Sequence, residues 1–296
     1  CRHYHVPPTS REPVLGEILS AAIAAGLVAI VVTVLIERYG GVVGGALGTI
    51  PTTIVPAVAG MAAAQGDSEL LDSLSVVPAG MLINAIFLSV WIYLPQVTAS
   101  MSSRRSLAIT TFTALLAWAS FGMATILCIG GLSDSGAGPR TIGMIGIALT
   151  ATFGMMLGWN PSESPKGSRE VSKPVLLARG LMAATAIGAS VWVAGLGYPL
   201  LAGLASVFPA IFLTSMVSLW ISQGPSVPRG AAAPMLLGGG SVGVYALVAM
   251  YSLDTHGMAV GSLIAWVVSV LGWSAPSYMF LRWRARESRS QRAISE

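Results

Sequence analysis

Charged side chains are scarce in this chain of 296 residues. Asp, Glu, Lys and Arg together make up 9% of it, against about 25% in soluble domains. Hydrophobic residues reach 54%, and the mean hydropathy is +0.75. This composition excludes an ordinary soluble globular protein and predicts a polytopic integral membrane protein.

Residues that commonly carry chemistry are also few. The two cysteines are Cys1 and Cys128, and because Cys128 lies in an apolar run they indicate no disulfide framework. No nucleophile, base and acid fall at one membrane depth, and no glycine-rich phosphate loop follows a strand. A metal could bind at the outer face, where His3, His5, Asp254 and His256 would all lie, but the spacing of these residues is not that of a metal-binding motif. We therefore expect no enzyme, no metal and no cofactor, although residues distant in sequence can still converge at the outer face.

Long apolar runs recur along the chain, and most are near the length of about 20 residues that crosses a bilayer as a helix. They cover residues 14–36, 41–64, 73–95, 106–129, 141–159, 174–195, 196–221, 231–251 and 257–281. The sequence therefore predicts an all-α fold with about nine transmembrane helices. Aromatic residues typical of the membrane interface lie near the ends of these runs: Trp91, Tyr93, Trp159, Trp220 and Trp283.

Lysine and arginine divide unevenly between the two sides of this nine-span arrangement. Thirteen fall on one side, including the five tail arginines from Arg282 to Arg292, and three fall on the other: Arg2, Arg11 and Arg140. The positive-inside rule places the N-terminus outside and the C-terminus in the cytoplasm. We expect a location in the plasma (bacterial inner) membrane. The basic tail is explained as a topology determinant or a contact for anionic lipid, so nucleic acid is not needed as a partner.

Two of the apolar runs are poor candidates for continuous helices. The run Gly41–Ala64 contains Pro51, which removes a helical hydrogen bond, and it has three threonines beside the break: Thr49, Thr52 and Thr53. The run Leu196–Ile221 carries Pro209 in a matching place. A pair of interrupted helices, one in each half, is typical of secondary transporters.

The two halves also share a spacing. An offset of 158 residues superposes Pro51 on Pro209 within a common Gly-x5-Pro-x13-Gln-Gly pattern, and an offset of 156 superposes Pro78 on Pro234. Five crossings separate the copies, so the second copy should be inverted. We expect an outer tail (1–13), a first repeat (14–139), a connector with a cytoplasmic loop (140–173), a second repeat (174–281) and a basic tail (282–296).

The segment from Glu37-Arg38-Tyr39-Gly40 through Gly44-Gly45, Ile50-Pro51-Thr52-Thr53 and Pro56 to Gln65-Gly66 resembles a group of bacterial integral membrane proteins without an assigned function. The resemblance covers about 30 residues. It differs from the group's pattern at Ile50, where that group has Leu, and at Ala64, where an acid often stands. The resemblance implies a membrane protein and no particular activity.

Candidate site residues cluster around the two interruptions. Hydroxyls there could bind a ligand or could satisfy carbonyls freed by the prolines. Asn84 lies at mid-depth in its run. A ligand contact and a hydrogen bond to a neighbouring helix explain an asparagine there equally well. The candidate substrate-binding residues are Thr49, Pro51, Thr52, Thr53, Asn84, Ser206, Pro209, Thr214 and Ser215. Glu17 is the carboxylate placed to carry a coupling proton, although both Glu17 and Arg179 can reach the interface by snorkelling.

These observations favour a transporter that moves a small polar solute, whether neutral, zwitterionic or anionic, by alternating access. The site would lie at the midplane between the two interrupted helices, and a proton or sodium ion would be the coupling partner. A channel of the same architecture is one alternative. A membrane-embedded enzyme or lipid-handling protein with a site at the outer face is another. The oligomeric state is left open.

Overall fold

The computed structural model describes residues 15–39, 50–159 and 172–295, and within these ranges all regular secondary structure is helical. The all-α prediction is therefore confirmed for this part of the chain. The helices are α1 (Leu15–Tyr39), α3 (Ile54–Ala64), α4 (Asp67–Val97), α5 (Ser103–Asp134), α6 (Pro139–Gly158), α7 (Lys173–Gly195), α8 (Pro199–Ser206), α9 (Ala210–Gln223), α10 (Ser226–Ser269), the π-helical turn η1 (Val270–Ser274) and α11 (Ala275–Ser295). Within the described ranges, seven segments are long and apolar enough to cross a membrane.

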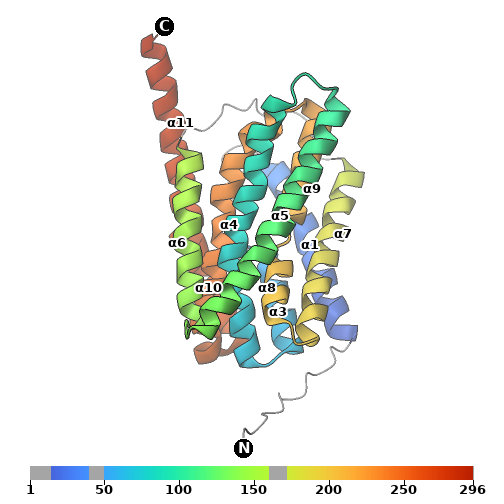
Figure 1. Cartoon of the computed structure of the whole chain (residues 1–296), viewed down its shortest axis with the longest axis vertical. Coiled ribbons are helices and arrows are strands. Elements are labelled where there is room, and N and C mark those ends of the chain that lie inside the picture. The colour runs from blue at the N-terminus through green and yellow to red at the C-terminus, as the bar shows by residue number, and fades with distance from the viewer. Residues whose placement is uncertain (1–14, 40–49, 160–171, 296) are drawn as a thin grey trace, which may run out of the picture.

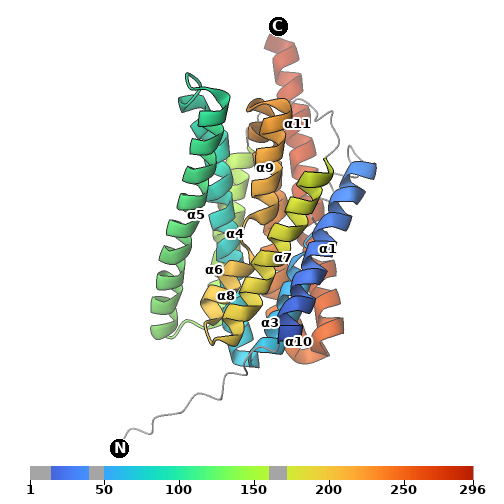
Figure 2. The same ribbon diagram turned by 90° about the vertical axis from the view of Figure 1, so that its right-hand side faces the viewer.

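The helices form one upright bundle, in which consecutive long helices run in opposite directions (Figures 1 and 2). α8 occupies the lower part of the bundle and α9 continues above it (Figure 2). α11 extends beyond the other helices at the upper end (Figure 1). α4 is the most buried of the spanning segments and α5 the least. α5 turns large apolar residues such as Phe112 and Leu127 outward, as a lipid-facing helix does.

The segment Ser226–Arg284 contains a chain reversal rather than one long helix. Gly257 has φ 73° and ψ 175°, a backbone conformation essentially restricted to glycine. The chain descends to this residue and returns upward through η1 into α11 (Figure 1). The loop predicted between residues 251 and 257 is therefore reduced to a turn at one residue.

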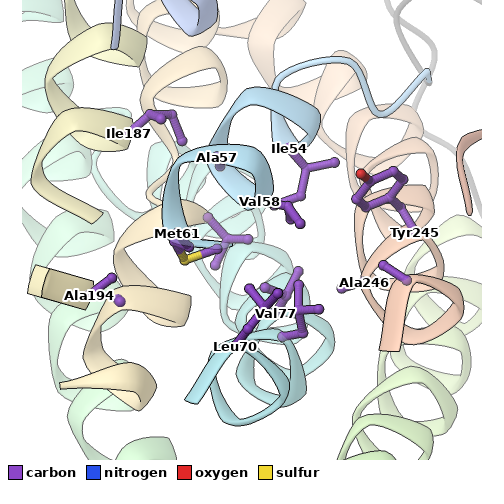
Figure 3. Packing of buried hydrophobic residues seen from close by; sticks show 14 of the residues in the cluster. Ile54, Ala57, Val58, Met61, Leu70, Val77, Ile187, Ala194, Tyr245 and Ala246 are labelled. Atoms are coloured by element: carbon purple, nitrogen blue, oxygen red, sulfur yellow. The ribbon is translucent and has the colours of Figure 1, made fainter. Parts of the chain in front are cut away.

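The largest buried cluster surrounds α3. Figure 3 shows α3 between α7, which contributes Ile187 and Ala194, and α10, which contributes Tyr245 and Ala246. α3 has only 11 residues, too few to cross a bilayer. Its burial against neighbouring helices holds it in place.

Two tryptophans expected at the membrane interface belong to the core instead. Trp91 is fully buried and Trp220 is 3% exposed, and their rings meet edge to face with centroids 6.1 Å apart. The Trp220 indole also donates to Ser103 Oγ at 3.1 Å. Both tryptophans lie near helix ends, but they are buried because they face neighbouring helices. Trp159 and Trp283 are half exposed, as the sequence suggests.

Small residues allow very close helix contacts at two crossings. A Cβ atom at Gly203 of α8 would overlap the backbone carbonyl of Ser73 on α4. On α1, a Cβ at Gly26 would lie 3.0 Å from the Gly180 oxygen and 3.2 Å from Ala184 Cβ of α7. These contacts fix the positions of α8 and α1 relative to the rest of the bundle.

Candidate functional site

The first interruption is the non-helical segment Ile50–Thr53, which leads into α3. Pro51 is buried, and Thr52 and Thr53 are half buried. The Thr52 amide donates to the Ile50 carbonyl at 2.9 Å, while Thr53 is the N-cap of α3 without a side-chain capping bond. Within the described residues neither threonine hydroxyl has a hydrogen-bond partner. Thr49, the remaining candidate here, lies outside the described residues.

The second interruption is Val207–Pro209, between α8 and α9. The hydroxyls beside it are bonded to their own helices: Ser206 Oγ donates to the Gly203 carbonyl at 2.7 Å, and Thr214 Oγ1 donates to the Ala210 carbonyl at 2.8 Å. Such local bonds satisfy carbonyls near a proline. The structure therefore gives Ser206 and Thr214 a backbone-satisfying role, in contrast to the unpaired hydroxyls of Thr52 and Thr53.

Asn84 of α4 connects to the second interruption directly. Its Nδ2 donates to the Val207 carbonyl at 2.9 Å, and its Oδ1 accepts from Trp118 Nε1 of α5, also at 2.9 Å. The Trp118 ring in turn meets Phe208 edge to face at 5.2 Å. Asn84 is only 3% exposed. It supplies a hydrogen-bond donor to a carbonyl that the end of α8 leaves without a helical partner.

The two interruptions border one buried apolar cluster. Ile54, the first residue of α3, and Val207, the first residue after α8, both belong to it, together with Met81 of α4. Ile54 projects toward Tyr245 of α10 (Figure 3). The start of α3 and the end of α8 thus border one cluster around α4, and the residues of that cluster are hydrophobic.

Arg179 of α7 is buried to a degree that the sequence did not indicate. It is 7% exposed, and it donates from Nη1 to Thr33 Oγ1 of α1 and from Nη2 to Ser215 Oγ of α9, both at 3.0 Å. The expectation that Arg179 snorkels to the interface is wrong, because its guanidinium group is held among three helices. Ser215, a candidate substrate contact, is one of the groups that hold it.

The other sequence candidates lie apart from the interruptions. Glu17 is half buried in the first turn of α1, and its backbone carbonyl accepts from Ser20 Oγ. Asp254 pairs with Arg140 at 2.8 Å, and Arg140 also donates to the Met250 carbonyl. The described residues contain no cluster of three or more His, Cys, Asp or Glu side chains able to hold a metal ion.

Comparisons with family models, curated proteins and solved structures gave no match.

Sequence reasoning did not select Trp118, Thr33 or the buried state of Arg179. A tryptophan in the middle of an apolar run is a usable signal, because a buried indole N–H normally finds an acceptor. A signal for Arg179 was also present, since an arginine inside a spanning helix is expected to face the bundle and to pair there. Thr33 had no distinguishing mark among apolar neighbours.

Proposed function

We propose that this chain is a nine-span membrane transporter built from an inverted repeat, moving a small polar solute by alternating access. The observation that carries the proposal is the pair of helix interruptions, one beginning α3 and one ending α8, which border the same buried cluster around α4. Interrupted helices at a repeat interface are typical of substrate sites in secondary transporters.

The helix arrangement supports nine crossings. The seven long segments count Ser226–Arg284 once, although the chain reverses within it at Gly257. Counted as two arms, this segment raises the number to eight. α3 is the described part of the predicted span 41–64 and supplies the ninth.

Contacts between the halves support the inverted repeat. The offset of 158 relates Gly26 to Ala184, and these two residues lie against each other where α1 crosses α7. The offset of 156 relates Met81 to Leu237, and Met81 contacts Gly239, two residues further on. A residue that meets its own counterpart is expected at a two-fold axis. Such an axis would pass between α1 and α7 and between α4 and α10.

A third correspondence concerns tryptophan. Trp118 of α5 bonds to Asn84 of α4, and Trp273 of η1 donates to the Leu237 carbonyl of α10 at 2.7 Å while its ring lies on Gly240. Gly240 is the counterpart of Asn84. Both halves therefore place an indole at the same point of the equivalent helix, with an amide in one half and a glycine in the other.

The chemistry of the interruptions favours a neutral, zwitterionic or anionic solute. α3 and α9 each begin near an interruption, and the N-terminus of a helix carries roughly half a positive charge. Thr52 and Thr53 offer unpaired hydroxyls beside the start of α3. We assign the substrate's hydrogen bonds to this first interruption, with Glu17 as the residue for a coupling proton.

The proposal is tested by uptake into proteoliposomes, using labelled small solutes of each charge class and a proton or sodium gradient. A transporter shows saturable uptake and counterflow, whereas uptake proportional to concentration without counterflow indicates a channel. If no solute of any class is taken up and none raises the melting temperature, the transporter assignment is wrong. The Arg-rich face is the side of the bundle that receives thirteen of the lysine and arginine residues. We place this face on the cytoplasmic side of a bacterial inner membrane and the N-terminus outside.

A further inference from the structure

The contacts of Arg179 join three helices at one level of the bundle. The side chain comes from α7, Thr33 from α1 and Ser215 from α9. Thr33 Oγ1 also donates to the Ala29 carbonyl at 2.7 Å, so it accepts from Arg179 while its own proton is used within α1. Ser215 is 6% exposed and Thr33 is 4% exposed. A charged group is thus enclosed where α1, α7 and α9 meet.

The level of this cluster can be placed along the helices. Arg179 is six residues after Lys173, the first residue of α7, or about 9 Å at 1.5 Å per residue. Ser215 is five residues after Ala210, the first residue of α9, or about 7.5 Å beyond the second interruption. The cluster therefore lies between the interruption and the Arg-rich face of the bundle.

The repeat relates this cluster to an apolar one at the opposite end. An offset of 158 relates Arg179 to Ala21, Thr33 to Val191 and Ser215 to Ala57, all of which are buried. Ala21 and Val191 close tightly over Gly60 of α3, where an added Cβ would lie 2.7 and 2.5 Å from their side chains. At one end of the bundle, the helices are thus held together by hydrogen bonds to the Arg179 guanidinium group. At the other end, they are held together by close packing of small and branched residues.

We propose that Arg179, through Thr33 and Ser215, is the latch that keeps the bundle closed on its Arg-rich side. This inference rests on the proposed transporter function and adds the element that controls access from one side. Opening there separates α1 and α9 from α7, which breaks both bonds and hydrates the guanidinium group. The opposite seam, where Ala21 and Val191 pack over Gly60, opens by separating apolar surfaces. Arg179 acts here as a positioning residue and not as a substrate contact.

The test measures accessibility from each side and does not need a known substrate. In a background with Cys1→Ser and Cys128→Ser, Thr53→Cys places a reporter at the first interruption. Its reaction with a membrane-impermeant maleimide is followed in right-side-out and inside-out vesicles. The latch is weakened by Thr33→Val combined with Ser215→Ala. The matched control is Thr152→Val combined with Thr185→Val, because those hydroxyls are exposed and bond only to carbonyls of their own helices.

We expect the latch variant to label about 25-fold faster from the Arg-rich side, the change that corresponds to losing two hydrogen bonds at about fivefold each. Labelling from the other side should stay the same or slow, and the control should match the parent on both sides. Thr33→Ser, which keeps the acceptor, should restore the parent rate, and Arg179→Lys should fall between. An unchanged rate on the Arg-rich side overturns the latch. An equal rise from both sides also overturns it, because it indicates general loosening. If solute uptake is normal but the latch variant changes the labelling rate on neither side, the latch is refuted and the transporter is not. If the latch variant raises the labelling rate from the Arg-rich side but no solute is taken up, only the transporter assignment is refuted.

Discussion

The side-chain amide of Asn84 donates to the backbone carbonyl of Val207, 123 residues away, at the point where α8 ends. This bond fixes the second interruption to the most buried helix of the bundle. It also means that the polar atom closest to the middle of α4 is already used in this conformation. Asn84 donates from Nδ2 to Val207 and accepts at Oδ1 from Trp118, so we assign it first to holding the interruption.

Replacing Asn84 by leucine should therefore destabilise the fold. The change leaves the Val207 carbonyl and the Trp118 indole without their partner. Because a buried group left unsatisfied costs on the order of 1–3 kcal/mol, and bonds between membrane helices average about 0.6 kcal/mol, we expect a loss of about 2 kcal/mol. The free energy of unfolding in mixed micelles measures it.

Gln96→Leu is the matched control for Asn84→Leu, because Gln96 bonds only to the Ile92 carbonyl of its own helix. It should change stability by less than about 0.5 kcal/mol. Equal effects of the two variants would show that the bond to Val207 contributes nothing particular.

Gly203→Ala should be poorly tolerated. The added methyl group meets the Ser73 carbonyl, which belongs to the backbone and cannot rotate away. Overpacking of this kind costs about 1–3 kcal/mol and displaces α8 from α4. Gly16→Ala, at a helical position with open space, should be neutral or slightly stabilising. Melting temperatures of both variants in one detergent would decide the matter, and an unaffected Gly203→Ala would argue against the close crossing.

The threonines of the two interruptions should respond differently to replacement by valine. Thr52→Val and Thr53→Val remove hydroxyls without a partner in the described structure, so stability should hold while solute affinity falls about fivefold per bond lost. Thr214→Val should leave affinity unchanged, because that hydroxyl bonds to the Ala210 carbonyl. Affinity and melting temperature should be measured on each purified variant.

Thr152→Val is the control for this series. The Thr152 hydroxyl is exposed and bonds to the Ala148 carbonyl of its own helix. If the affinities of all the variants, including the control, change alike, the solute binds elsewhere.

Single cysteines at Ser102 and Ser135 should label from opposite sides of the membrane. Ser102 precedes α5 and Ser135 follows it, and both are exposed. The distribution of arginines predicts that Ser102 reacts from the cytoplasm and Ser135 from outside. Impermeant maleimide added to intact cells, in a background with Cys1→Ser and Cys128→Ser, gives the answer. Reaction of both from one side would refute the proposed orientation.

The class of fold and the second interruption were predictable from the sequence because they depend on local properties. Apolar runs near 20 residues require helices in a bilayer, and proline in a helix interior removes a hydrogen bond and kinks or breaks the helix. Pro78, Pro95 and Pro234 nevertheless lie inside continuous helices, so proline alone does not identify an interruption. Pro209 accordingly stands at the gap between α8 and α9, and Pro51 lies in the non-helical segment before α3.

What the sequence could not supply depends on partners far away along the chain. Arg179 bonds to Thr33, 146 residues distant, and its burial follows from that packing rather than from its place near the end of a run. Trp91 and Trp220 were expected at the membrane interface because they lie near the ends of apolar runs. They face each other inside the bundle instead. Nothing local distinguishes a helix end that meets lipid from one that meets another helix.

The reversal at Gly257 has a consequence for biosynthesis. The two arms of Ser226–Arg284 are joined through one glycine, so they form a helical hairpin whose polar tip is short and contains residues 254–256. Arg229 lies near the start of the first arm and Arg282 near the end of the second, so both are at the end of the hairpin opposite Gly257. The hairpin can thus insert as a paired unit, and its arginines prevent it from passing through. A bulkier residue at position 257 would disturb the insertion of both arms at once.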